Sequence, residues 1–226
     1  MYSEWHAPKS SGGTSSEACL SFDHGREHRL LILPPLFDEH NKFRRQAVEI
    51  MRRLDTQGID TFLPDLPGCN ESLSPLRDQS LASWRTAAEA AAAHFSATQV
   101  LAIRGGALLA PATLFCWSYA PAKGRQLLRA MIRARTIAAR EAGREEKADA
   151  LLAEGRAQGL ELAGWTLGAE MIAQLEQAEP ATGKNTRLIE QVELGGSPLW
   201  LRAEPDDDPA QADALAALVA DGMTAG

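Results

Sequence analysis

The sequence predicts an α/β fold, in which a mostly parallel sheet lies between two layers of helices. Compact apolar runs at 29–33, 59–63 and 100–103 have the length and composition of buried strands. Segments with the spacing of amphipathic helices, 43–57 and 80–95, lie between them. Strands that alternate with helices favour a parallel sheet joined by right-handed crossovers, so we expect a doubly wound, three-layer architecture.

The first half of the chain supplies the boundaries of these elements. Residues 1–17 are polar and rich in Ser and Gly, so we expect a disordered leader, followed by a short strand at 18–22. Pro34 ends the first apolar run, because proline cannot donate to a sheet ladder. Gly58 closes the first helix, and Trp84 lies on the apolar stripe of the alanine-rich second helix.

The second half begins with the same alternation and then departs from it. After the strand at 100–103 we expect a helix at 107–112 and a fourth strand at 113–117. A helical insertion follows at about 124–180, and it is interpreted either as a lid over the strand ends or as a cover for the sheet. Residues 18–226 then form a single domain, which ends with extended runs at 187–194 and 198–202, an acidic linker and an alanine-rich helix.

Composition excludes several classes of function. A net charge of −7 argues against nucleic-acid binding, which requires a basic surface. No apolar run reaches the roughly 18 residues of a membrane span, and residues 1–16 lack the apolar segment of a signal peptide, so we expect a cytoplasmic protein. The spacing of Cys19, Cys69 and Cys116 matches neither a disulfide framework nor a zinc site. We expect no metal and no cofactor, because phosphate-loop and dinucleotide patterns are also absent.

The stretch from Val100 to Ala110 is typical of a buried strand, a sharp glycine turn and the start of a helix. A hydrolase of the α/β type places its serine nucleophile at the tip of such a turn, in the pattern Gly-x-Ser-x-Gly. Here the tip is Arg104, followed by Gly105 and Gly106. The pattern therefore predicts the elbow of such a fold without its nucleophile.

Three segments together resemble the second type of exosortase A system-associated hydrolases, over about residues 30–204. The segments are Glu39-His-Asn-Lys-Phe-Arg-Arg45, Asp65-Leu-Pro-Gly-Cys-Asn-Glu-Ser72 and Ile103-Arg-Gly-Gly-Ala107. The resemblance implies a bacterial protein with an α/β-hydrolase-like three-layer sandwich, encoded with exopolysaccharide and protein-sorting systems. The chain departs from the family pattern at Pro34, Asn70 and Ala102. The family pattern itself carries Arg where a nucleophile should be, so the hydrolase name rests on fold analogy.

The histidines argue against a standard serine hydrolase. The usual triad runs in the chain order Ser, acid, His, yet in these 226 residues no histidine follows His94. We therefore expect a pseudo-hydrolase. The alternative is an ester or thioester hydrolase with an unconventional site, in which Cys69 is the nucleophile, His40 its base and Arg104 a neighbour. Against that alternative, Cys69 can simply fill a small space in a Pro-Gly turn.

Arg104 has two interpretations. Beside a helix N-terminus, with two glycines that let a ligand approach the backbone, it is typical of a pocket for an anionic group. Alternatively the guanidinium pairs inside the protein with Asp65, Asp38 or Glu39 and locks the loops together. A purely structural subunit would have no concave pocket at the strand ends.

The loop after the first strand supplies further candidates. Asn41 is expected to cap the following helix, and Lys42, Arg44 and Arg45 would lie in its first turns, where the helix dipole disfavours cations. Either an acidic loop or an anionic ligand offsets them, or they join a network with Asp38, Glu39 and Glu49. Asp65 is expected to cap its own turn. The expected ligand is a small anionic or acyl molecule, or else a protein partner, at Arg104, Gly105, Gly106, Glu39, Asn41, Lys42, Arg44, Arg45 and Asp65.

Overall fold

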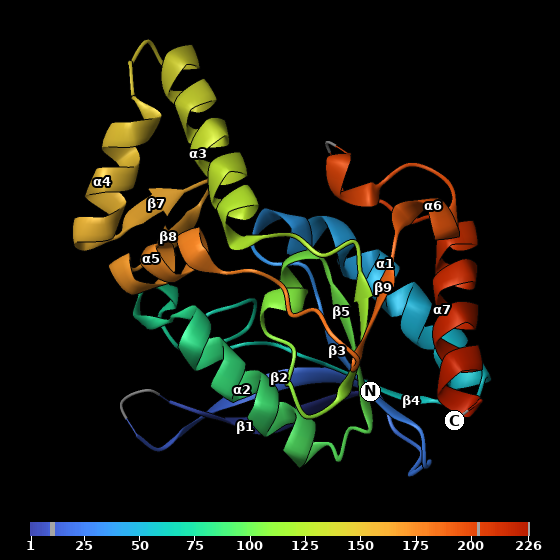
Figure 1. The fold of residues 1–226 in the computed structure, drawn as a ribbon. Coiled ribbons are helices and arrows are strands. Elements are labelled where there is room, and N and C mark those ends of the chain that lie inside the picture. The colour runs from blue at the N-terminus through green and yellow to red at the C-terminus, as the bar shows by residue number, and fades with distance from the viewer. Residues whose placement is uncertain (10–11, 203, 226) are drawn as a thin grey trace.

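The computed structural model describes residues 1–9, 12–202 and 204–225. In this part of the chain the main sheet has seven strands in the order β1-β2-β4-β3-β5-β6-β9 (Figure 1). Strand β2 is antiparallel to both of its neighbours, and the other five strands of the run, β4, β3, β5, β6 and β9, are parallel to one another. The strands are β1 Tyr2–Pro8, β2 Thr14–Phe22, β3 Arg29–Leu33, β4 Asp60–Pro64, β5 Gln99–Ile103, β6 Phe115–Tyr119 and β9 Thr186–Ile189.

Helices cover both faces of the sheet. Helices α1 and α7 lie on one face, and α2 lies on the other together with α3 and α5 (Figure 1). The helices are α1 Asp38–Thr56, α2 Leu81–His94, α3 Gly124–Glu141, α4 Ala148–Gln158, α5 Ala169–Gln177, α6 Gln191–Leu194 and α7 Pro209–Thr224. Short 3-10 turns form η1 (Leu76–Asp78), η2 (Arg104–Leu108) and η3 (Leu199–Leu201). The predicted three-layer α/β architecture is therefore confirmed.

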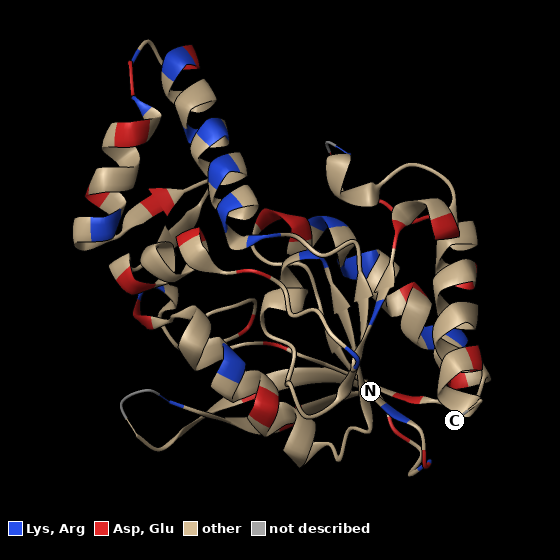
Figure 2. Ribbon diagram, viewed as in Figure 1, with Lys and Arg blue, Asp and Glu red and all other residues tan. Residues whose placement is uncertain are grey.

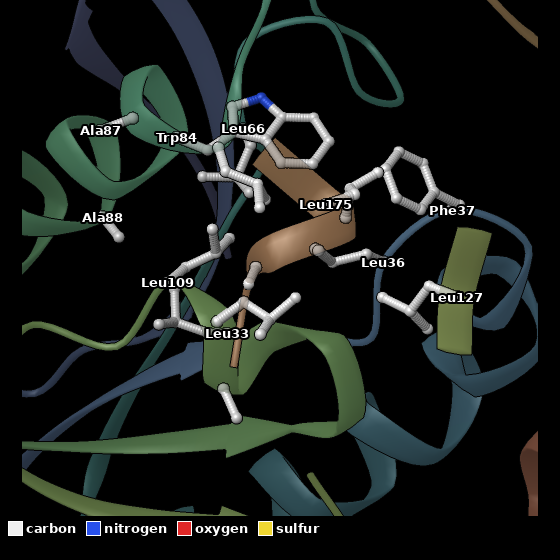
Figure 3. Packing of buried hydrophobic residues seen from close by; sticks show 14 of the residues in the cluster. Leu33, Leu36, Phe37, Leu66, Trp84, Ala87, Ala88, Leu109, Leu127 and Leu175 are labelled. Carbon is white, nitrogen blue, oxygen red and sulfur yellow. The ribbon is translucent and has the colours of Figure 1, made fainter. Parts of the chain in front are cut away.

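Two apolar cores result from the alternation of side chains along each strand. In β5, Val100 and Ala102 enter the core under α2, whereas Leu101 and Ile103 enter the core under α1 and α7. Figure 3 shows the first of these cores around Trp84 of α2. The indole N–H of Trp84 donates to the Pro67 carbonyl at 2.9 Å, so this buried polar group is satisfied. Cys116 is buried in the same core.

The insertion forms an arm beyond the carboxyl ends of the strands (Figure 1). It consists of α3, α4, α5 and a small hairpin, β7 (Leu160–Leu162) and β8 (Trp165–Leu167). Charged residues line α3 and α4 (Figure 2), and ion pairs tie the arm together, Arg135 with Glu146 at 2.8 Å and Arg156 with Glu176 at 2.6 Å. At the base of the arm, the start of α3 packs closely against α5, where a Cβ on Gly124 would clash with the Leu175 carbonyl.

The expectation of a disordered leader over residues 1–17 is wrong for the part that the structure describes. Residues Tyr2–Pro8 form β1 and pair with β2, which begins at Thr14. Trp5 and Ala7 are fully buried, while their neighbours point outward. Two inward side chains at a spacing of two stabilise an edge strand, and the surrounding polar residues hide this signal in the sequence. Residues 10 and 11 of the expected leader lie outside the described residues.

Three further expectations need correction. The helix expected at 107–112 is instead the 3-10 turn η2, which ends at Leu108, shortly before Pro111. The extended run expected at 187–194 stops at Ile189, because α6 begins at Gln191. The run expected at 198–202 contains the 3-10 turn η3 after Pro198. No helix among the described residues is both long and apolar enough to cross a membrane.

Candidate functional site

The turn between β5 and η2 has the backbone shape of an elbow. Arg104 adopts a φ of +53°, a left-handed conformation that is unfavourable for a residue with a Cβ. A Cβ on Gly106 would clash with the carbonyl oxygens of Leu33 and Pro34, so only glycine fits there. The elbow is therefore held in place by direct backbone packing against the segment that follows β3.

The Arg104 guanidinium is bound on all sides by the protein. Its Nε and Nη2 donate to the two carboxylate oxygens of Glu39 at 3.0 and 2.9 Å. Its Nη1 donates to the Ala120 carbonyl at 2.9 Å, and the Trp200 ring lies 4.3 Å from the guanidinium carbon. The Arg104 side chain is 17% exposed and the Glu39 side chain 18%. Of the three expected internal partners, the structure selects Glu39, in a bidentate geometry.

A pocket of about 370 Å³ opens next to this ion pair. Glu39 and Trp200 line it, and Arg104 lies behind them. Lys42 also lines it and is paired with Asp38 at 2.8 Å. The other walls are apolar and come from the segment after β3, from α3, from the β7–β8 turn and from η3: Leu36, Phe37, Leu127, Ala130, Met131, Ala134, Ala163 and Leu201. A mostly apolar hollow at the carboxyl ends of the strands is where α/β folds bind small molecules.

A polar cluster lies behind the first turns of α1. Asp65 accepts a hydrogen bond from the Asn70 amide at 2.5 Å, and Arg44 lies 3.5 Å from the same carboxylate oxygen. The amide nitrogen of Asn70 is 3.2 Å from Nε2 of His40. Burial, together with the nearby Arg44 charge, lowers the pKa of His40 to about 4, so the imidazole is neutral at pH 7.

Cys69 and His40 are not joined by a hydrogen bond in the described part of the chain. His40 Nε2 faces Asn70 and Arg44 instead, at 3.2 and 3.4 Å. Burial raises the pKa of the Cys69 thiol to about 12, and the charges of Asp65 and Glu17 act in the same direction. Since the thiolate is the nucleophilic form, this cysteine lacks the electropositive setting of a reactive one.

The remaining candidates, on α1 and after β4, do not share one pocket. Asn41 is exposed inside the helix, so the expectation that it caps α1 is wrong: the helix begins at Asp38, after Phe37. Arg45 is 71% exposed and pairs with Asp207 at 2.8 Å. Asp65 contacts the Asn70 side chain and Arg44 rather than capping its own turn through the backbone.

The pocket walls are residues that sequence reasoning did not select. Leu36, Met131 and Trp200 lie far apart in the sequence, and each is ordinary for its own element. Among the described residues, no group of three or more His, Cys, Asp and Glu side chains is placed to hold a metal ion.

No family model matches the chain, and no curated protein matches its sequence. Solved structures do match its fold. Alpha/beta hydrolase domain-containing protein 10 from mouse superposes with a TM-score of 0.58 at 14% identity, over 99% of both chains. A protein from Agrobacterium vitis S4 assigned as a hydrolase superposes with a TM-score of 0.51 at 13% identity, over 99% of this chain and 98% of its own. The strand order, the elbow and these superpositions together show that the chain has the α/β-hydrolase fold.

Proposed function

We propose that this protein is a non-hydrolytic member of the α/β-hydrolase fold that binds an acyl group in the pocket above the elbow. The observation that carries the proposal is the state of the elbow tip. Arginine stays protonated in proteins and cannot attack a carbonyl carbon. Here its donors are occupied by Glu39 and by the Ala120 carbonyl, while an apolar pocket lies beside it.

The ion pair favours an acyl ligand over an anionic one. A bidentate carboxylate already occupies the guanidinium, so a ligand anion would have to displace Glu39 and leave it without its partner. An unpaired charge in a desolvated setting is costly, so the displacement of Glu39 opposes the binding of an anion. The pocket walls instead offer Phe37, Leu127 and Met131. Its volume of about 370 Å³ lies within the range of roughly 300–1,000 Å³ that small-molecule sites occupy.

Binding can be measured directly with methyl octanoate as a neutral acyl probe and octanoate as its anionic counterpart. We expect the ester to bind at least as well as the acid, because the rim offers no free cation. Ala134→Phe should weaken binding of both probes about tenfold or more by filling the pocket. The matched control is Ala138→Phe, one turn further along α3 and outside the pocket lining. Equal binding by wild type and the Ala134 variant would refute the proposal.

Hydrolysis is tested with p-nitrophenyl octanoate. We expect no release above the uncatalysed background, and no change in Cys69→Ala or His40→Gln. Turnover that disappears in Cys69→Ala would instead establish the alternative, an ester or thioester hydrolase around Cys69, His40 and Arg104. The raised pKa of the Cys69 thiol argues against that outcome.

The biological setting that we propose comes from the resemblance alone. The second type of exosortase A system-associated hydrolases is encoded with exopolysaccharide and protein-sorting systems in bacteria. We propose a role in such a pathway, as a carrier or sensor of an acyl compound or as a partner of another protein of the system. Deletion of the gene should alter the amount or size of the exported polysaccharide, and re-expression of Ala134→Phe should not restore it. An unchanged polysaccharide would remove this assignment.

A further inference from the structure

A second hollow lies at the first turn of α3, beside the edge strand β9 of the main sheet. It encloses about 520 Å³ between the first turn of α3, the connection from α5 to β9, and strands β6 and β9. Figure 1 shows that connection descending past the start of α3 to β9. The hollow exists because the last strand is covered on one face only. Ile189 is fully buried beneath α7, whereas Leu188, which points the other way, is 45% exposed.

Ser118 of β6 lines this hollow and has an unsatisfied hydroxyl. The residue is 2% exposed, and its Oγ has no hydrogen-bond partner among the described residues. Its neighbours across the sheet are Ala102 and Leu188, whose side chains offer no polar atom. A buried hydroxyl without a partner is destabilising, so its presence at the floor of a hollow calls for a ligand atom or an ordered water.

The lining of the hollow carries one basic residue, Lys123, and a second, Arg125, follows it in the first turn of α3. Lys123 lies 2.7 Å from a carboxylate oxygen of Glu179, and Arg125 lies 3.7 Å from the other. Two cations thus share one carboxylate, and Glu179 is the one acidic residue among the described residues that line the hollow. The 18-residue helix α3 begins at Gly124 and directs the positive end of its dipole to the same place.

We propose that this hollow binds a small molecule with an oxyanion, a carboxylate or a phosphate. The anionic group lies near Lys123 and the start of α3, and it accepts a hydrogen bond from the Ser118 hydroxyl. Thr182 and Gln126 line the same space and suit a ligand that also has hydroxyl groups. The site is separate from the pocket above the elbow and shares none of its lining residues, so it does not depend on acyl binding there.

The test uses the whole protein with inorganic phosphate and lactate as probes, titrated by calorimetry and by NMR of the Gly183 amide. We expect at least one probe to bind and to shift that resonance, and the pair distinguishes a phosphate ligand from a carboxylate one. Lys123→Gln and Ser118→Ala should each weaken binding about tenfold, the loss that corresponds to one charge-assisted hydrogen bond. Lys9→Gln makes the same charge change on the β1–β2 hairpin and should leave binding unchanged.

Ser118→Ala also keeps the proposal falsifiable without any ligand. It should fold with an unchanged or higher Tm, because it removes a buried hydroxyl that has no partner. A clearly lower Tm would show that the hydroxyl is already satisfied and would overturn the proposal. The absence of binding by both probes, or equal binding by Lys123→Gln, would overturn it as well. Methyl octanoate should bind equally to both variants, so failure here is distinguishable from failure of the elbow pocket.

Discussion

The elbow pocket and the hollow beside β9 are both lined by residues of α3, yet the polar groups of the two regions differ in whether they have hydrogen-bond partners. At the elbow, every donor group of Arg104 finds an acceptor inside the protein, and the adjoining pocket is mostly apolar. Beside β9, a buried hydroxyl has no partner in the described structure and two cations share one carboxylate. At the elbow, where α/β hydrolases carry their nucleophile, the polar groups of Arg104 are paired within the protein. At the sheet edge beside β9, the Ser118 hydroxyl lacks a hydrogen-bond partner among the described residues.

The largest effect should come from breaking the packing that holds the elbow. Gly106→Ala adds a Cβ that clashes with the Leu33 and Pro34 carbonyls, and backbone atoms cannot move aside as a flexible side chain can. We expect a loss of about 4 kcal/mol in the free energy of unfolding, or failure to fold. Gly143→Ala is the control: φ is positive there but nothing lies within 4 Å, so about 1 kcal/mol should be lost. Urea unfolding of both variants measures the difference, and similar losses would contradict a packed elbow.

Acid should lower the free energy of unfolding, because His40 is buried in its neutral form. Its folded pKa of about 4 lies below the usual value of about 6.5, so the unfolded chain binds the proton more tightly. Stability is therefore full above pH 6.5 and declines as the pH falls from there towards 4, by up to about 3 kcal/mol. Urea titrations at a series of pH values should show this slope for the wild type.

His40→Gln is the control for that titration. It keeps a polar side chain in the cluster but removes the titrating group, so the slope between pH 6.5 and 4 should shrink markedly. A variant that keeps the full slope would show that other groups cause the acid sensitivity.

A smaller loss should follow from neutralising one partner of the elbow ion pair. Glu39→Gln leaves the Arg104 charge unpaired in a mostly buried setting, and we expect a loss of about 2 kcal/mol, because partial exposure softens the penalty. Arg104→Met combined with Glu39→Met should cost less than the Glu39→Gln change alone, since no unpaired charge remains. A double variant that is less stable than Glu39→Gln would show that the pair contributes more than the charge balance described here.

The smallest expected effect is a stabilisation in the hollow beside β9, opposite in sign to the losses expected at the elbow. Ser118→Ala should raise the free energy of unfolding by about 1 kcal/mol, because the buried hydroxyl has no partner. Thr186→Ala, on the same side of the neighbouring strand but half-buried, should change it by less. Calorimetric melting checks both. A destabilised Ser118 variant would make the two regions alike, with all of their polar groups satisfied.

The burial of residues in a local sequence pattern could be predicted, but most contacts between segments far apart in the sequence could not. The runs 29–33 and 100–103 are apolar throughout, so their burial as central strands follows from composition. The β1 strand was missed because only Trp5 and Ala7 point inward. The Arg104–Glu39 pair was among the predicted contacts, because parallel strands end at one edge. Trp200 and Ala120 complete it from segments whose positions depend on the whole fold.

The elbow separates backbone architecture from reactivity. The turn keeps Arg104 at a positive φ through the fit of Gly106 against two carbonyls, and nothing in that fit involves the side chain at the tip. The residue at the tip can therefore be exchanged while the backbone of the turn keeps its conformation. Exchanging Arg104 and Glu39 together for small residues would join the space that they fill to the existing pocket. This chain is for that reason a scaffold on which other residues can be placed at the tip of the elbow.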